Sequence, residues 1–130
     1  MPYVHSIRVR YGECDMQRVV FNAHFLAYCD DAVDTWFRAV LSSDAGGFEE
    51  LGFDFMLKTL TITWTSPLVF GETVALTCSV SRWGNASFDV VIEGTVDVAP
   101  RFSANLTYVS VVPRANTPIR IPDRVRELLG

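Results

Sequence analysis

The sequence is poor in the residues that build disulfide frameworks and metal sites. Its 130 residues include only three cysteines and two histidines. Cys14, Cys29 and Cys78 are widely spaced and odd in number, which fits neither a disulfide framework nor a set of metal ligands. His5 and His24 lack HxH or HxxxH spacing, so we expect no metal site and no cofactor.

Long apolar runs and basic clusters are also missing. No apolar run approaches the roughly 20 residues that a membrane-spanning helix needs, and the N-terminus lacks the basic-then-apolar order of a secretory signal. We therefore expect a cytoplasmic protein with no membrane span. The net charge of −4 comes without a basic block, which argues against nucleic acid as a partner.

What the sequence does have is the composition of an ordinary globular domain. About half of the residues are hydrophobic (49%) and a fifth are charged (20%). A length of 130 residues suits one hydrophobic core, and there is no linker, internal repeat or low-complexity segment. We expect a single domain over residues 1–130.

Hydrophobic periodicity predicts a strand followed by a long helix. Residues 3–11 alternate between two faces, which is the pattern of a half-buried strand. Asn22 is a good N-cap for a helix over 23–41, and Gly46 and Gly47 interrupt the chain after it. The apolar residues of this segment recur at helical spacing and form a wide stripe. They are Phe25, Leu26, Tyr28, Cys29, Ala32, Val33, Trp36, Phe37, Val40 and Leu41.

After residue 55 the alternation is that of four strands. Their short connections predict antiparallel pairing. The tail over 117–129 has two prolines and then a short amphipathic helix starting near Asp123. One long helix against a five-stranded antiparallel sheet is an α+β domain. The alternating runs lie at 60–64, 74–80, 88–92 and 102–108.

The segment between the first strand and the helix carries a family resemblance. Residues 10–25 read Arg-Tyr-Gly-Glu-Cys-Asp-Met-Gln-Arg-Val-Val-Phe-Asn-Ala-His-Phe. This resembles the signature of hotdog-fold acyl-CoA thioesterases, in the group of 4-hydroxybenzoyl-CoA thioesterase and the Tol-Pal-associated thioesterases. Shorter matches follow in the expected order. They are Asp31-Ala32, Pro67 with Gly71-Glu72, and Ile121-Pro122-Asp123.

The resemblance implies a hotdog domain, in which the sheet wraps around one central helix, and hydrolysis of an acyl-CoA thioester to a free acid and coenzyme A. Asp15 would attack the carbonyl carbon directly or act as general base for water. The backbone N–H of Asn22, or of a neighbour in the first helical turn, would stabilise the oxyanion with help from the helix dipole.

The same resemblance implies residues near the acyl group. Phe25 and Tyr28 match positions that lie near the acyl pocket in the family, although their place in the helical stripe equally predicts core packing. His24 lies in the first helical turn, where it is a candidate substrate contact or a packed imidazole.

Three charged residues are candidates for other roles. Arg18 stands where the family usually has glycine, so it either demands a different backbone or points outward to a phosphate. Arg82, beside the Trp83-Gly84 turn, is a candidate phosphate contact or a solvated side chain. Asp31 is a possible second acid, or a surface carboxylate on the helix.

Other functions stay open at this point. Cys14 could be a nucleophile with His24 as its base. A hydratase or dehydratase on this fold needs a catalytic histidine beside an acid, and the position of Asp15 does not match that arrangement. The domain could instead bind acyl chains without catalysis, or hydrolyse thioesters of acyl carrier protein.

The resemblance also implies an assembly. Members of the family form homodimers in which two sheets join edge to edge and the active site uses both subunits, and many pair again into homotetramers. Val91, Val109 and Val111 lie on strand faces opposite the helix-facing residues, and such apolar positions need cover.

Overall fold

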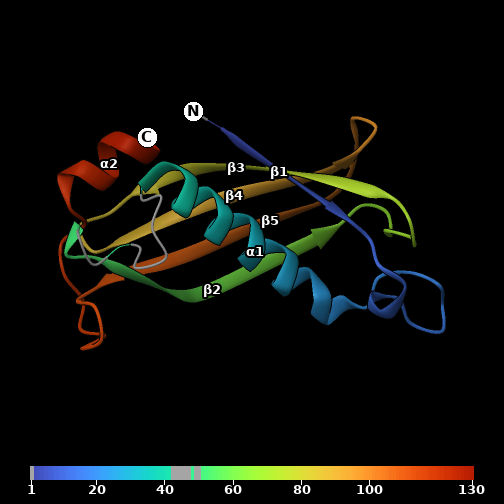
Figure 1. Cartoon of the computed structure of the whole chain (residues 1–130), viewed down its shortest axis with the longest axis horizontal. Coiled ribbons are helices and arrows are strands. Elements are labelled where there is room, and N and C mark those ends of the chain that lie inside the picture. The colour runs from blue at the N-terminus through green and yellow to red at the C-terminus, as the bar shows by residue number, and fades with distance from the viewer. Residues whose placement is uncertain (1, 42–47, 49–50) are drawn as a thin grey trace.

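In the computed structural model, a long helix lies across one face of a five-stranded sheet (Figure 1). The structure describes residues 2–41, 48 and 51–130. The predicted order of one strand, one long helix and four further strands is confirmed. The elements are β1 (Tyr3–Arg8), a 3₁₀ turn η1 (Tyr11–Glu13), α1 (Asn22–Leu41), β2 (Asp54–Trp64), β3 (Thr73–Trp83), β4 (Ser87–Val96), β5 (Ala99–Val111) and α2 (Asp123–Leu129).

The strands follow the spatial order β1-β3-β4-β5-β2, and every neighbouring pair is antiparallel. Strands β3, β4 and β5 form a meander through short turns, as their spacing predicts. The connection from β2 to β3 crosses β4 and β5, because β2 pairs with β5 on the side away from β4. Among the described strands, the two edges of the sheet are therefore the six-residue β1 and the longer, 11-residue β2.

The apolar stripe of α1 packs against the inward-facing residues of the sheet and forms the core. Seven residues of the predicted stripe are buried, and they are Phe25, Tyr28, Cys29, Ala32, Val33, Trp36 and Phe37. Leu26 is 45% exposed, so the stripe is narrower than predicted on that side. The helix begins at Asn22 itself, one residue earlier than an N-cap at this position would give.

One further boundary and the exposure of one residue differ from the sequence prediction. The first strand ends at Arg8 and not at residue 11, because the main chain of Val9 turns to bond with the 65–72 connection: its N–H donates to Glu72 and its carbonyl accepts from Gly71. Val111 is only 2% exposed, because the tail pairs against it at Pro118. The predicted helix break at Gly46 and Gly47 lies outside the described residues.

The two ends of the molecule are built differently. The loop between β1 and α1 lies at one end of the long axis, and α2 with the C-terminus lies at the other (Figure 1). Helix α2 is held there by Arg126, which donates to the carbonyl of Gly84 and packs over the ring of Trp83. No helix among the described residues is long and apolar enough to cross a membrane.

Candidate active site

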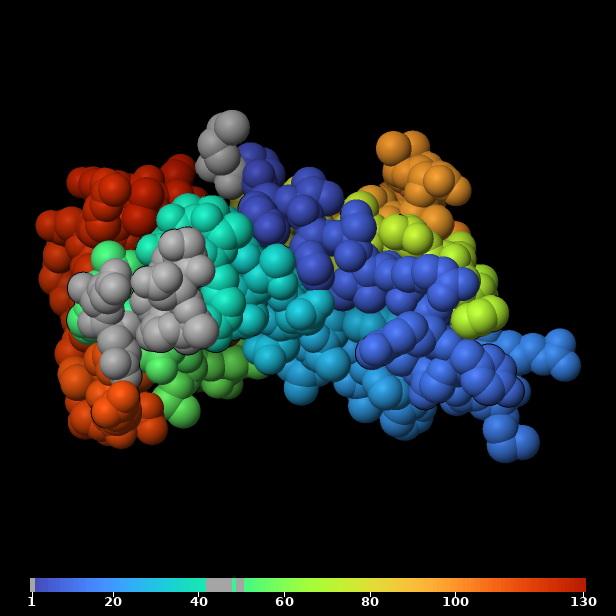
Figure 2. All heavy atoms as spheres, viewed as in Figure 1, coloured from blue at the N-terminus to red at the C-terminus, as the bar shows by residue number. Residues whose placement is uncertain are grey.

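The loop that joins β1 to α1 folds back on itself as a small hairpin. Cys14 and Val20 form an isolated antiparallel bridge, and the N–H of Asp15 donates to the carbonyl of Val19 at 2.9 Å. The N–H of Arg18 donates to the carbonyl of Asp15, also at 2.9 Å, which closes the tip. This hairpin projects from the surface at the end of the molecule opposite α2 (Figure 2). Asp15 is therefore held in an ordered turn that protrudes from the fold.

The carboxylate of Asp15 is half-buried and has one oxygen available for chemistry. Its Oδ1 accepts a hydrogen bond from the N–H of Gln17 at 2.8 Å, an Asx-type turn that orients the side chain. Among the described residues, Oδ2 has no hydrogen-bond partner. A carboxylate fixed by one oxygen and open at the other can accept a proton or attack an electrophile.

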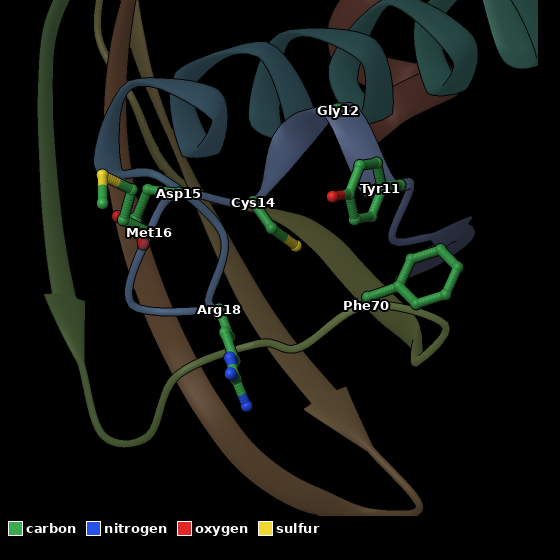
Figure 3. A pocket seen from close by; sticks show the side chains of 7 residues that line it. All are labelled: Tyr11, Gly12, Cys14, Asp15, Met16, Arg18 and Phe70. Carbon is green, nitrogen blue, oxygen red and sulfur yellow. The ribbon is translucent and has the colours of Figure 1, made fainter.

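Asp15 lines a cavity of about 750 Å³ with residues from the hairpin and from the 65–72 connection. Figure 3 shows Asp15 and Met16 on one side of this cavity, and Tyr11 and Phe70 on the other. The two aromatic rings meet edge to face, with 5.9 Å between their centroids. The remaining lining residues are Gly12, Cys14 and Arg18.

Backbone N–H groups without partners mark the start of α1. The N–H of His24 donates to the carbonyl of Phe21, but among the described residues the N–H groups of Asn22 and Ala23 have no acceptor. Such groups carry the positive end of the helix dipole and bind developing negative charge. The structure thus leaves the predicted oxyanion donor, Asn22, available for a ligand.

A second cavity, of about 330 Å³, opens at this helix start. Phe25 is 2% exposed and packs edge-on against Trp64, a residue 46% exposed at the end of β2. Asn22 lines this cavity and not the one beside Asp15. The full lining is Val19, Val20, Asn22, Phe25, Trp64, Thr65, Ser66 and Pro67.

Two other predicted contacts on α1 lie outside these two cavities. The ring of His24 packs edge-to-face on Phe21, with 6.4 Å between centroids. Tyr28 is 3% exposed, and its hydroxyl donates to Oε1 of Glu13 at 2.8 Å. The core-packing interpretation of Tyr28 therefore holds, with a polar contact that the helical pattern does not reveal.

Arg18 keeps a backbone conformation that glycine adopts easily. Its φ is 68°, in the left-handed region, which costs a non-glycine residue roughly 1 kcal/mol. The arginine is therefore accommodated, with strain, in a conformation that favours glycine. Its side chain points away from Asp15 in Figure 3, and it has no ion-pair partner in the part of the chain that the structure describes.

The structure does not bring Arg82 or Asp31 into these cavities. Arg82 lies near the α2 end of the sheet, where its Nε and Nη2 donate to the carboxylate of Asp89 at 2.7 and 3.2 Å. Asp31 accepts from Nε2 of His5 at 2.7 Å, a pair that joins α1 to β1, and its side chain is 59% exposed. Both residues are thus paired away from Asp15 within one chain.

The alternative nucleophile also lacks its partner. The thiol of Cys14 lies 3.9 Å from the carbonyl of Arg10, and no contact joins it to the imidazole of His24 among the described residues. In the same part of the chain, no group of three or more His, Cys, Asp and Glu side chains is arranged to hold a metal ion.

Three aromatic residues of these cavities are not predicted as site residues by the sequence pattern. Tyr11 is predicted as part of the first strand, but it is 80% exposed in η1. Phe70 is 53% exposed in the connection after Pro67, and Trp64 ends an alternating strand. The sequence signal that could have identified them is an aromatic residue beside a connection that contains proline or glycine, where the sheet cannot bury the side chain.

Comparison with known proteins gives the family. A model of the thioesterase-like superfamily matches residues 9–129, which is nearly the whole chain. The protein therefore belongs to the thioesterase-like superfamily, and the matched region includes the hairpin with Asp15. No curated protein matches the chain.

Solved structures agree on the fold. A thioesterase-superfamily protein from Jannaschia sp. CCS1 has a TM-score of 0.89 at 21% identity, over 98% of this chain and 90% of that one. The 1,4-dihydroxy-2-naphthoyl-CoA thioesterase from Synechocystis has a TM-score of 0.85 at 15% identity, over 99% and 96%. A gentisyl-coenzyme A thioesterase has a TM-score of 0.85 at 20% identity, over 98% and 100%. The predicted α+β hotdog fold is confirmed.

Proposed function

We propose that this protein is an acyl-CoA thioesterase that uses Asp15 as nucleophile or general base, over a single domain of residues 1–130. The observation that carries the proposal is the open oxygen of Asp15 on a hairpin that leads directly into the unpartnered N–H groups of α1. Membership of the thioesterase-like superfamily supports hydrolysis of a thioester. Two structural neighbours described as CoA thioesterases support coenzyme A as the thiol.

The proposed reaction uses Asp15, the N–H groups at the start of α1 and water. Asp15 accepts a proton from water as the water oxygen attacks the carbonyl carbon, or it attacks that carbon itself and the resulting anhydride is then hydrolysed. The carbonyl oxygen becomes an oxyanion, stabilised by the N–H groups of Asn22 or Ala23. The C–S bond then breaks and coenzyme A leaves as a thiolate, a leaving group that needs little help from an acid.

The acyl group is proposed to occupy the second cavity, between the start of α1 and the end of β2. Phe25 and Trp64 supply an apolar, partly exposed wall there, and His24 lies in the same helical turn. Apolar walls with a few polar groups are typical of small-molecule sites. Tyr28 is packed, so any effect of it on the substrate would pass through its neighbours. Asp31, which pairs with His5, stays a prediction for a second acid.

Wild-type activity on a panel of substrates tests the function. The panel contains short aliphatic, long aliphatic and aromatic acyl-CoA esters and an acyl carrier protein thioester, with release of free thiol as the signal. Hydrolysis of one or more CoA esters supports the proposal. Activity confined to the carrier-protein substrate would make that the function, and no activity on any ester would favour a non-catalytic acyl-binding domain.

Arg18 is proposed to contact a phosphate of coenzyme A. Because the pantetheine arm separates the phosphates from the thioester, a phosphate contact is expected to point away from Asp15, as Arg18 does in Figure 3. A cation held in a strained backbone at a proposed active site is consistent with a functional role. Arg82 remains a second prediction for such a contact, although its bidentate pair with Asp89 occupies its guanidinium within one chain.

The substitution Arg18→Gly tests the backbone strain of Arg18 and its proposed phosphate contact by two separate measurements. Removing the strain is expected to stabilise the fold by about 1 kcal/mol, seen as a higher Tm. Losing the phosphate contact is expected to raise KM for an acyl-CoA about tenfold, with KM for the matching acyl-pantetheine unchanged. Arg124→Gly, which removes a surface arginine on α2, is the control for the change in KM. An equal change in KM for both substrates would contradict the phosphate contact.

We also propose a homodimer, or a homotetramer built from dimers, with the active site at the subunit interface. The long edge strand β2 and the start of α1 expose apolar side chains that a partner would cover, namely Met56, Trp64, Phe21 and Leu26. Light scattering is expected to give a mass of two or four 14.5 kDa chains, and a monomer would contradict the assembly.

A further inference from the structure

A buried carboxylate lies at the base of the hairpin that carries Asp15. Glu13 is only 9% exposed. Its Oε1 accepts from the N–H of Arg10 and from the hydroxyl of Tyr28, both at 2.8 Å, and its Oε2 accepts from Nη2 of Arg10 at 3.0 Å. Buried carboxylates are uncommon and need such partners, so this contact set requires an explanation.

The protonation states of this cluster are fixed by its contacts. Burial alone would raise the pKa of Glu13, but the hydrogen bonds from Arg10 and Tyr28 outweigh it and lower that pKa below its usual value. Burial and the bond to Glu13 raise the pKa of Tyr28. Glu13 therefore stays ionised, and Tyr28 stays a neutral donor, throughout the pH range in which the protein would work.

The main chain of Glu13 makes a second connection in the same place. Its carbonyl accepts from the N–H of Phe21 at 2.9 Å, and Phe21 immediately precedes α1. Its side chain meanwhile reaches Tyr28, in the second turn of α1. Glu13 thus joins the incoming arm of the hairpin to its outgoing arm and to the helix, two residues before Asp15.

We propose that Glu13 is a positioning residue for catalysis, which sets the place of Asp15 relative to the N-terminus of α1 through its bonds to Tyr28, Arg10 and Phe21. This inference rests on the proposed function. The base, Asp15, and the oxyanion donors at Asn22 and Ala23 lie at the two ends of the hairpin arm that Glu13 fixes at Phe21. Their separation must match a thioester within fractions of an ångström, and a misplacement of about 1 Å can cost roughly 100-fold in rate.

The experiment compares two variants that each change one group of the cluster. Tyr28→Phe deletes only the hydroxyl, and Glu13→Gln keeps the shape while removing the charge. Each is expected to lower kcat about 10- to 100-fold with KM changed less than about threefold, as for other groups that orient a catalytic side chain. The double variant is expected to lose little more than the worse single variant, because both variants disturb the same contact between Glu13 and Tyr28.

A stability control and a structural measurement separate positioning from general weakening. Val125→Ala truncates a fully buried side chain on α2, far from the hairpin, and is the control for a general loss of stability. Amide hydrogen exchange then follows the N–H of Asp15, bonded to Val19, and the N–H of Phe21, bonded to Glu13. Faster exchange is expected at these amides in both hairpin variants, with unchanged exchange in β4.

The outcomes distinguish the two proposals. A fall in kcat with local loosening of the hairpin supports positioning by Glu13. Wild-type kcat in both variants, or a loss no larger than that of Val125→Ala, overturns it. If the wild-type protein hydrolyses no thioester, the proposed function fails. Exchange at the two amides then shows by itself whether Glu13 fixes the hairpin, because that measurement needs no substrate.

Discussion

Asp15→Asn is expected to lower kcat for thioester hydrolysis by about 1,000-fold or more, with little change in KM. Asparagine has the same shape and its amide oxygen can still accept the bond from Gln17, so the hairpin should keep its conformation. What is lost is the free Oδ2. The amide nitrogen that replaces it neither accepts a proton nor attacks carbon. Steady-state kinetics on the best acyl-CoA of the panel measure the effect.

Two companion variants make this result specific. Asp123→Asn removes a surface carboxylate on α2 and is expected to leave kcat unchanged. Asp31→Asn breaks the exposed pair with His5 and tests the second acid directly. Wild-type rates in Asp15→Asn would sink the mechanism, and a large loss in Asp31→Asn alone would move the catalytic role to the helix.

Gly94→Ala is expected to destabilise the fold by about 3 kcal/mol, a decrease in Tm of roughly 10 °C. Gly94 is buried on β4 beneath the ring of Phe102, its cross-strand partner on β5. A β-carbon at this position would lie 2.5 Å from Cδ1 and 2.7 Å from Cζ of that ring, and closer still to Cε1. The ring of Phe102 has little room to move, because it already packs on the ring of Phe25, with 5.0 Å between the ring centroids.

Thermal or urea unfolding of Gly94→Ala checks this expectation. Gly12→Ala is the control for stability, because a β-carbon there meets nothing within 4 Å. A Tm within about 2 °C of wild type for Gly94→Ala would show that the core can relax around the methyl group. Because Phe25 also packs on Trp64, a displaced Phe102 is expected to alter the proposed acyl cavity as well.

The sequence alone predicted the element order, since periodicity reports which residues a helix or strand must bury. The stripe of α1 and the alternation of β3, β4 and β5 are clear because each has one buried face. Pairing across the sheet is not written in any local pattern. Nothing in the runs themselves puts β2 beside β5 or β1 beside β3, because each pair joins strands that are far apart in the sequence.

The candidate site divides in the same way. A short motif was enough to select Asp15, Asn22 and Arg18, because a loop leading into a helix start is a local feature. Only tertiary structure decided what their neighbours are, since contacts such as Tyr11 with Phe70 or Phe25 with Trp64 join residues far apart in the chain. It also showed that Arg18 adopts the glycine-like backbone, because hydrogen bonds within the hairpin fix that turn whatever residue occupies it.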